Sequence, residues 1–234
     1  MKWNKKFEYP ASIRSSIEGK RHYEITGQKL PSVTTILSAT QSPEKKAKLE
    51  EWKKRVGTQQ ADRIRDVSAM RGTAMHTYLE GYILGKNHLD LTSIGREAER
   101  MANVVIEKGL GDLGEVWGSE VTLYYPGLYA GATDVVGMYN GREAIIDFKQ
   151  TNKPKKREWI EDYCLQLAGY AMAHNFIYKT SITKGVIMMC SKDNYYQEFV
   201  IEGAELQKYK HEFLRKVAQY YKMQDEGALD NNAV

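Results

Sequence analysis

The stretch GATDVVGMYNGREAIIDFK, residues 131–149, decides the fold of this chain. It predicts two β-strands joined by a tight turn, because an Asn-Gly pair between apolar runs is the strongest short-range signal for a hairpin. Residues 144–146 are apolar without interruption, which is typical of a strand buried on both faces. Asp147 and Lys149 follow on one face of the strand end, since side chains alternate along a strand. Burying an acid and a base costs free energy unless each is paired, so this strand end is the first candidate site.

Helices and strands surround this hairpin in a regular order. Apolar spacing and helix-end signals predict helices over residues 42–56, 61–85, 94–108, 156–177 and 204–223. Alternation and apolar runs predict strands over residues 115–125, 128–139, 142–148, 182–190 and 195–201. Near the N-terminus, residues 22–28 are typical of one arm of a short hairpin, and residues 31–37 of the start of a helix. This order predicts an α/β fold with one central sheet flanked by helices.

Length and charge set broad limits on the fold and on possible partners. With 234 residues the chain fits a single domain. We expect an N-terminal hairpin and helical elaboration over residues 1–60, a core that carries the site over residues 61–224, and a flexible polar tail over residues 225–234. The net charge of +4 is too small to indicate a nucleic-acid partner by itself.

Cysteine content and hydropathy indicate the compartment. The chain has 2 cysteines, too few for a disulfide framework or for a zinc or iron–sulfur site built on cysteines. This favours a reducing, cytoplasmic setting. No stretch approaches the roughly 20 apolar residues of a membrane span, and the N-terminus lacks the apolar segment of a secretory signal. We therefore expect a soluble protein without a membrane partner.

Polar side chains on two predicted strands and one predicted helix would converge in such a fold. Asp134 lies on the first strand of the hairpin, Asp147 ends the second, and His76 and Glu80 are four residues apart on the helix over residues 61–85. Mg²⁺ prefers oxygen ligands and keeps several waters, so two carboxylates and a backbone carbonyl suffice for a minimal cage. Lys149 beside such a cage is suited to hold a water or to offset charge on a phosphate. The combination predicts metal-dependent hydrolysis of phosphodiester bonds.

Each of these features has a simpler structural explanation when it is taken singly. Asp147 and Lys149 are compatible with an exposed ion pair, which stabilises a fold little. His76 alone is more often a core histidine than a metal ligand, and Glu80 fits the polar side of an amphipathic helix. The basic run over residues 153–157 fits a solvated loop. Ordinary packing also explains a helix face that carries Trp159, Tyr163, Gln166 and Tyr170.

Taken together and in order, the motifs resemble those of the PD-(D/E)XK nuclease superfamily in its RecB-like exonuclease branch. The matching segments are Gly72-x-x-x-His76, Gly131-x-x-Asp134, Ile146-Asp147-Phe148-Lys149 and Gln166-x-x-x-Tyr170. The sequences LPSVTTIL, residues 30–37, and DFKQTNKP, residues 147–154, are similar to those of mitochondrial genome maintenance exonucleases and their phage-encoded relatives. The resemblance covers residues 30–201. It implies a single nuclease domain with a restriction-endonuclease-like core, a central mixed sheet flanked by helices and an N-terminal helical elaboration.

The resemblance also implies roles for individual residues. Asp134 and Asp147 would hold two divalent ions, Mg²⁺ or Mn²⁺, together with His76 and the backbone carbonyl of Phe148. Lys149 would orient the attacking water, so that Asp134, Asp147 and Lys149 form the catalytic set. Some relatives carry an iron–sulfur cluster, which two cysteines exclude here.

Further residues are candidates for contact with DNA. By the same resemblance, Gln166 and Tyr170 would line the site and hold the scissile strand, and Lys153 would meet a phosphate. The branch often has Thr after the catalytic lysine, whereas this chain has Gln150 and then Thr151, which puts the local phosphate contact in question. Lys155 and Arg157 would track the DNA backbone, and Trp159 and Tyr163 are candidates for stacking on bases. Glu80 and Glu120 lie near the motifs as candidate site residues without an assigned role.

The expected function is that of a DNA exonuclease that prefers single strands with a free end and acts in DNA replication, recombination or degradation. The N-terminal helices would form a passage over the site. Two alternatives stay open: a nucleic-acid-binding module that no longer cleaves, and a structure-specific endonuclease that cuts closed circles. We expect a cytoplasmic location, which includes a phage-encoded protein acting in its host. Polarity, processivity, oligomeric state and protein partners are left open by the sequence.

Overall fold

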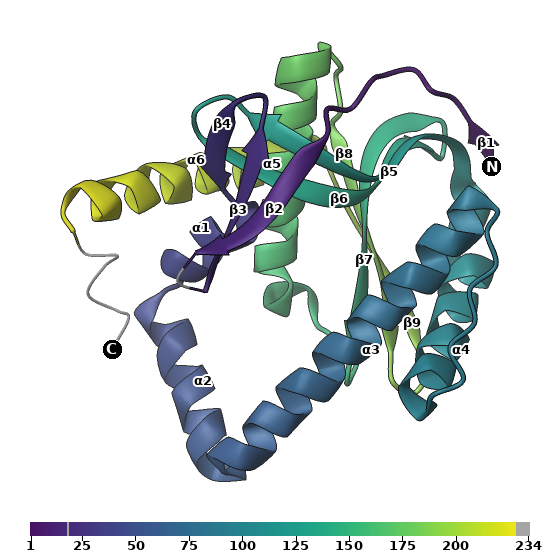
Figure 1. Ribbon diagram of the computed structural model, residues 1–234, viewed down its shortest axis with the longest axis horizontal. Coiled ribbons are helices and arrows are strands. Elements are labelled where there is room, and N and C mark those ends of the chain that lie inside the picture. Colours follow the sequence, from purple (N-terminus) through teal and green to yellow (C-terminus); the bar gives the residue numbers. More distant parts are fainter. Residues whose placement is uncertain (18, 228–234) are drawn as a thin grey trace.

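The computed structural model describes residues 1–17 and 19–227, and a six-stranded sheet lies at their centre (Figure 1). The strands follow the order β1-β5-β6-β7-β8-β9 across the sheet. The pairs β1–β5 and β7–β8 are parallel, and the other neighbours are antiparallel. The predicted mixed sheet is therefore confirmed. The bounds of the strands are β1 Lys2–Trp3, β5 Leu113–Tyr125, β6 Tyr129–Tyr139, β7 Arg142–Thr151, β8 Lys184–Ser191 and β9 Tyr196–Glu202.

Helices cover both faces of this sheet. The helices α3 (Thr58–Leu84) and α4 (Ser93–Lys108) pack on one face, and α5 (Glu161–Tyr178) and α6 (Gly203–Asp225) pack on the other. Within β7, Ile145 belongs to the core on the α5 side, whereas Ala144 and Ile146 belong to the core on the α3 side. The apolar run thus serves a strand that is buried on both faces, as predicted.

The turn between β6 and β7 has the geometry that its sequence predicts. Asn140 has φ 48° and Gly141 has φ 71°, the left-handed pair that a tight two-residue hairpin requires. The pairing of β6 with β7 then runs from Tyr139 opposite Arg142 to Val135 opposite Ile146. This register fixes which side chains of the two strands share a face.

The N-terminal region forms a second, smaller sheet. The strands β2 (Ser12–Ile17), β3 (Lys20–Ile25) and β4 (Gln28–Pro31) pair antiparallel. The predicted hairpin arm corresponds to β3 and β4, and α1 (Val33–Ala39) follows it. The sequence did not reveal β2, because its side chains are mostly exposed and show no apolar alternation.

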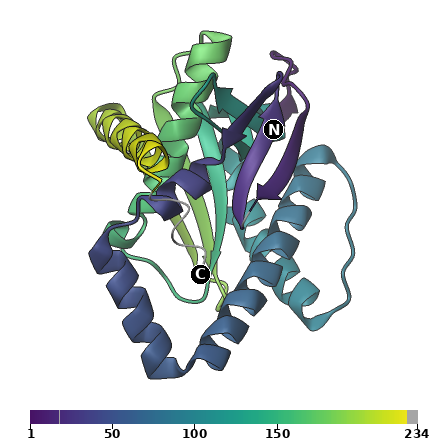
Figure 2. The same ribbon diagram turned by 60° about the vertical axis from the view of Figure 1, so that its left-hand side comes forward.

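The helices α2 (Pro43–Val56) and α3 meet at Gly57 and form an arch, whose junction stands away from the sheet (Figures 1 and 2). Ser42 caps α2 by accepting a hydrogen bond from the backbone N–H of Lys45, and Pro43 occupies the first turn, as predicted. Gly57 has φ 86°, a value that favours glycine and permits the sharp turn into α3. No residue of α2 is buried, so the interior of the core does not hold this helix in place.

Two predicted boundaries were wrong. Strand β7 continues to Thr151 instead of ending at residue 148, because pairing with β8 extends to Thr151 opposite Ser191. The helix predicted from residue 156 begins only at Glu161, and Arg157–Trp159 form a 3₁₀ turn ahead of it. Of the predicted tail, residues 228–234 lie outside the described residues. Within the described part of the chain, no helix is long and apolar enough to cross a membrane.

Candidate active site

Three carboxylates meet at one level of the central sheet. The pairs Ser119–Val135 and Val121–Thr133 flank Glu120 and Asp134, so these two lie opposite each other on β5 and β6. Continuing the β6–β7 register by one step past Val135 places Asp147 opposite Asp134 on the other side. Asp134 is 7% exposed and Asp147 is 2% exposed. Two nearly buried acids on adjacent strands repel each other when both are ionised. This repulsion destabilises the fold unless nearby cations offset it.

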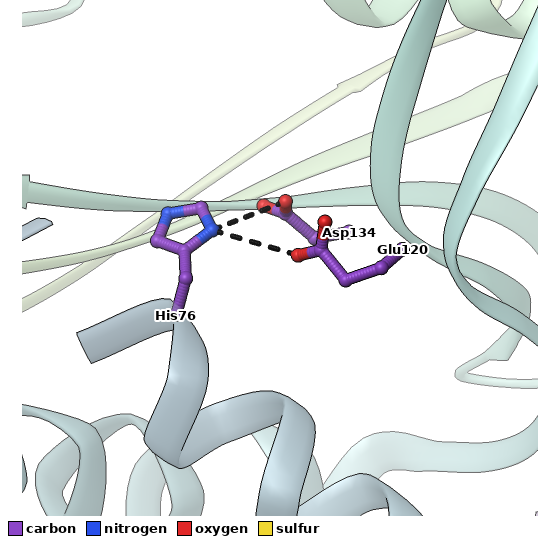
Figure 3. Close-up of side chains that lie close together, drawn as sticks. All are labelled: His76, Glu120 and Asp134. Carbon is purple, nitrogen blue, oxygen red and sulfur yellow. Dashed lines mark ion pairs between the residues drawn. The ribbon is translucent and has the colours of Figure 1, made fainter. Parts of the chain in front are cut away.

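His76 reaches this group from the middle of α3 (Figure 3). Its Nδ1 lies 3.2 Å from Asp134 Oδ1 and 3.8 Å from Glu120 Oε1. The three residues each offer one ligand atom, and these atoms all lie within 4.8 Å of one another. The sequence placed His76 and Asp134 together but assigned no role to Glu120, because only the pairing of β5 with β6 brings it to the site.

The backbone of Glu120 is unusual. Its φ is 52°, in the left-handed region that non-glycine residues rarely adopt, and least of all within a strand. Such a conformation costs on the order of 1 kcal/mol or more and is found preferentially at functional sites. The strain coincides with the position at which Glu120 faces His76 and Asp134.

Lys149 completes the cluster on the side of β7. Its ammonium forms an ion pair with Asp147 Oδ2 and lies 5.1 Å from the ring centre of Tyr163 on α5. Between these two residues, the backbone N–H of Phe148 donates a hydrogen bond to Asp134 Oδ2 at 2.5 Å. In an extended strand the N–H and C=O of one residue point toward the same neighbouring strand. The Phe148 carbonyl is therefore directed toward Asp134.

The charges of the cluster shift one another's pKa values. Burial raises the pKa of Asp147, and the nearby Asp134 adds to this, so that it reaches about 6 despite the attraction of Lys149. Burial alone would lower the pKa of His76, but the Asp134 and Glu120 carboxylates outweigh it and raise that pKa to about 10. Burial also raises the pKa of Glu120. When both are protonated, His76 and Lys149 are the cations that offset the negative charge of the carboxylates. A bound metal ion would share this role.

Gln166 and Tyr170 lie one helical turn apart on α5 and are joined to each other. Gln166 Nε2 donates a hydrogen bond of 2.9 Å to Tyr170 Oη. The Tyr170 ring packs so tightly on Gly131 that a Cβ there would lie 2.7 Å from Tyr170 Cε1. Gly131 is thus needed for the approach of α5 to β6, which explains the glycine three residues before Asp134.

The basic and aromatic candidates that follow β7 differ in their exposure and in their contacts. Lys153 is exposed and Lys155 is half-buried. Arg157 donates to Glu205 at 2.5 and 3.2 Å and to the carbonyl of Val200, so its guanidinium is engaged with α6 and β9 and does not face the cluster. Trp159 is 58% exposed in the 3₁₀ turn and shares no helix face with Tyr163.

Glu80 stands one turn beyond His76 on α3. It lies near enough to Glu120 to contribute to the raised pKa of that carboxyl, but it is outside the group of close ligand atoms formed by His76, Glu120 and Asp134. The structure therefore places Glu80 at the edge of the cluster.

Sequence reasoning missed a buried polar contact that ties α3 to the end of β7. Arg71 is 3% exposed, and its Nε lies 3.0 Å from Glu97 Oε2 on α4. Its Nη1 donates to Asn152 Oδ1 at 3.3 Å, and Asn152 Nδ2 donates to Ser68 Oγ at 3.0 Å. The one signal for this contact in the sequence was that Arg71 precedes Gly72 of the motif Gly72-x-x-x-His76. The contact links α3, which carries His76, to the residue that follows β7.

The donor set of the cluster fits a small divalent cation. Carboxylate and carbonyl oxygens suit Mg²⁺ and Mn²⁺, and an imidazole ligand is acceptable to Mn²⁺ and other transition metals. Asp134, Glu120 and His76 are already within 4.8 Å of one another, and Asp147 and the Phe148 carbonyl adjoin Asp134. The residues present therefore suffice to hold metal.

Comparison of the sequence with known proteins gives relatives of one kind. The chain is 27% identical to mitochondrial genome maintenance exonuclease 1 of Xenopus tropicalis over 202 residues, 80% of this chain and 55% of that protein. It is 29% and 28% identical to the proteins of the same name from Mus musculus and Homo sapiens, over 70% of this chain and 50% of each of those proteins. The chain thus spans about half the length of the curated relatives it matches. No family model matches the sequence.

Solved structures give weaker similarity. A candidate exonuclease from Eubacterium rectale has a TM-score of 0.48 and 14% identity, over 70% of this chain and 69% of that chain. An alkaline exonuclease from Laribacter hongkongensis has a TM-score of 0.31 and 17% identity, over 66% of this chain and 83% of that chain. The resemblance inferred from the motifs is confirmed by the sequence relatives: over most of its length, this chain is similar to the mitochondrial genome maintenance exonucleases.

Proposed function

We propose that this protein is a metal-dependent DNA exonuclease that hydrolyses phosphodiester bonds of single strands with a free end. One observation carries the proposal: the metal-ligand group His76, Glu120 and Asp134 adjoins the buried Asp147–Lys149 ion pair. A metal cage beside a lysine is an arrangement suited to phosphodiester hydrolysis. The relatives named as exonucleases support the same reaction.

We assign the metal ligands by their position in the cluster. His76, Glu120 and Asp134 would hold one divalent ion, and Asp134, Asp147 and the Phe148 carbonyl would hold a second, with Mg²⁺ or Mn²⁺ as the ion. When bound, these ions supply Lewis-acid activation of a water and of the phosphate. The buried negative charge of the acids favours binding of cations over anions at this level of the sheet.

The side chains around the proposed metal site would position the attacking water and the DNA strand. The Lys149 ammonium is held between Asp147 and the ring of Tyr163, which limits the directions in which it can donate hydrogen bonds. It is suited to orient the attacking water or to stabilise charge on the phosphate. Gln166 and Tyr170, joined by their hydrogen bond, would contact the scissile strand from α5. Glu80 would influence this site through Glu120 only.

The arch of α2 and α3 supports a requirement for a free end. Lys45 at the start of α2 lies 2.7 Å from Glu161 Oε2 and 3.0 Å from Asp162 Oδ1 at the start of α5. Farther along, Ser68 on α3 bonds to Asn152 after β7. These contacts and residues 152–161 join the two ends of the arch, so that the chain forms a closed ring, of which Figure 2 shows α2 and α3 as two sides. A strand with a free end passes such a ring by threading, whereas a closed circle does not.

Several further assignments belong to the same proposal. Lys153 and Lys155 would follow the DNA backbone, with Trp159 and Tyr163 as stacking surfaces and Arg157 released from Glu205 to join them. The chain would act as a single nuclease domain. A cytoplasmic location, in a cell or as a phage protein in its host, is supported by two buried free cysteines.

The test is degradation of single-stranded DNA labelled separately at its 5′ and 3′ ends, alongside a closed circle of the same sequence. We expect the linear strands to be shortened stepwise with Mg²⁺ or Mn²⁺ and to be stable in EDTA, and the circle to persist. Cleavage of the circle would favour an endonuclease. Binding of linear DNA without cleavage in either metal would favour a module that binds nucleic acid only.

A further inference from the structure

A basic cavity lies between the N-terminal sheet and the first helices, where the ends of β2 and β3 approach α1 (Figure 1). It has a volume of about 760 Å³ and is distinct from the metal-ligand cluster. None of the described residues that line it is acidic. Its basic lining residues are Arg14, Lys20, Arg21 and Lys46.

Three of these cations form no ion pair within the described part of the chain. Arg14, Arg21 and Lys46 are exposed and take part in none of the ion pairs found among the described residues. The chain as a whole carries a net charge of only +4, whereas the described lining of this cavity holds basic side chains and no acidic one. Such a concentration attracts anions.

Neutral hydrogen-bond donors accompany the cations. Thr34 and Ser38 are exposed on α1 one helical turn apart, and both line the cavity. Phosphate oxygens in nucleic-acid complexes are bound by this combination of Arg or Lys with hydroxyl groups. The lining is spread over two strands and three helices, which is broader than a single phosphate needs.

The cavity is connected to the candidate active site through the small sheet. Arg14 pairs with Tyr23, and Ser16 pairs with Arg21, so these four side chains share one face of β2 and β3. Tyr23 is buried against Ala130 at the start of β6 and lies near enough to Tyr170 to affect the pKa of its hydroxyl. The small sheet therefore carries the arginines of the cavity at its exposed end and packs through the buried Tyr23 beside Tyr170 of the candidate active site.

We propose that this basic cavity binds the phosphodiester backbone of the single strand outside the arch, at nucleotides removed from the one being cleaved. The inference rests on the proposed exonuclease function and adds a second DNA subsite to it. The occupant is argued from charge, from the hydroxyl donors and from the position of the cavity on the sheet that packs beside Tyr170.

The experiment measures the affinity of the full chain for fluorescein-labelled oligo(dT) by fluorescence anisotropy in EDTA, with oligonucleotides of about 4 and about 16 nucleotides. The variant is Arg14→Ala/Arg21→Ala. The matched control is Arg142→Ala/Lys179→Ala, which removes the same charge near the β6–β7 turn and after α5. Lys46→Glu on α2 serves as a second, independent variant that leaves the small sheet intact.

We expect the Arg14→Ala/Arg21→Ala variant to bind the longer oligonucleotide about tenfold more weakly and the shorter one within about twofold of wild type. Each phosphate contact to a single strand contributes about 0.7 to the salt slope of log K, so the slope should fall by about 1.4. The control should match wild type for both lengths, and Lys46→Glu should weaken binding of the longer strand only.

The outcomes separate this inference from the proposed function. If wild type degrades linear DNA and the variants of the basic cavity bind the longer strand like the control, the second subsite is wrong while the exonuclease stands. If wild type binds DNA through the basic cavity but degrades none with Mg²⁺ or Mn²⁺, the proposed function fails and the DNA-binding cavity stands. Equal loss of affinity for both lengths would place these arginines at the active site and overturn a separate subsite.

Discussion

The backbone N–H of Phe148 is bound to Asp134 at 2.5 Å, which ties the strand residue between Asp147 and Lys149 directly to the neighbouring strand. This bond holds the end of β7 beside β6 at the point where regular pairing of the two strands stops. It directs the Phe148 carbonyl, Asp134 and Asp147 toward one location. The predictions below follow from this arrangement and from the helices around it.

Replacing Glu120 by glycine should separate stability from activity. With φ 52°, Glu120 is strained, and glycine would relieve that strain, which offsets the usual cost of about 0.5–1 kcal/mol for glycine in a strand. We expect an unfolding free energy equal to or above that of wild type in chemical denaturation, together with a large loss of nuclease activity. The control Ser119→Gly on the same strand should lose about 0.5–1 kcal/mol and keep its activity. An equal loss of stability in both variants would show that the backbone of Glu120 is not strained.

Removing the ammonium of Lys149 should affect the chemical step more than substrate binding. In Lys149→Met the apolar stem is kept, but the water or phosphate loses its donor and Asp147 loses its ion-pair partner. We expect kcat to fall by about 10²–10⁴-fold, with a much smaller change in KM. Lys149→Arg should not restore the rate, because the guanidinium donates in a different geometry. A variant with increased KM and unchanged kcat would assign Lys149 to binding only.

Opening the ring at the base of α2 should relax the requirement for a free end. Lys45→Glu replaces two attractive contacts, to Glu161 and Asp162, by repulsion. We expect this variant to nick circular single-stranded DNA that wild type leaves intact. The control Lys53→Glu breaks only an exposed ion pair with Glu50 on the same helix and should leave circles intact. Equal resistance of circles to both variants would contradict closure of the ring at this contact.

Protonation of a buried histidine should limit stability in mild acid. Burial lowers the pKa of His174 to about 4, with a smaller effect of Lys6, and its ring nitrogens meet Tyr9 and Thr180. Because the unfolded chain binds this proton near pH 6.5, the unfolded state carries more protons between pH 6.5 and 4. The free energy of unfolding should therefore fall by about 2 kcal/mol from pH 8 to pH 5 on account of this group.

The His174→Gln variant tests this pH dependence, since it lacks the titrating ring. Denaturant unfolding at pH 8 and pH 5 should show a smaller loss of stability in the variant than in wild type, although the variant is less stable at pH 8. Parallel curves for the two proteins would mean that other groups cause the acid sensitivity.

Local sequence signals were sufficient for most of the fold. The hairpin over residues 131–149 follows from its Asn-Gly turn and its apolar run, and α3 follows from its apolar spacing. The strands β1 and β2 were not predicted, because β1 has only 2 residues and β2 is mostly exposed. The late start of α5 was missed because Arg157–Trp159 form a 3₁₀ turn that the apolar pattern does not distinguish from a helix.

The candidate site was predictable only in part. Order and spacing identified Asp134, Asp147, Lys149 and His76, but the position of Glu120 depends on strand pairing and on a backbone conformation that glutamate seldom adopts. The engagement of Arg157 with Glu205 depends on the distant helix α6, to which no local pattern points. Tertiary contacts of this kind are outside the reach of a single sequence.

The most direct test of the central claim compares Asp134→Asn with the matched control Asp112→Asn, an exposed acid near the start of β5. The measurement is the rate of shortening of end-labelled linear single-stranded DNA with saturating Mn²⁺, after circular dichroism has shown both variants to be folded. Asn keeps the shape of Asp134 but removes the charge that links both proposed ions. We predict a rate at least about 100-fold below wild type for Asp134→Asn and an unchanged rate for Asp112→Asn. A folded Asp134→Asn variant that degrades DNA at the wild-type rate would contradict the assignment of this cluster as the catalytic metal site.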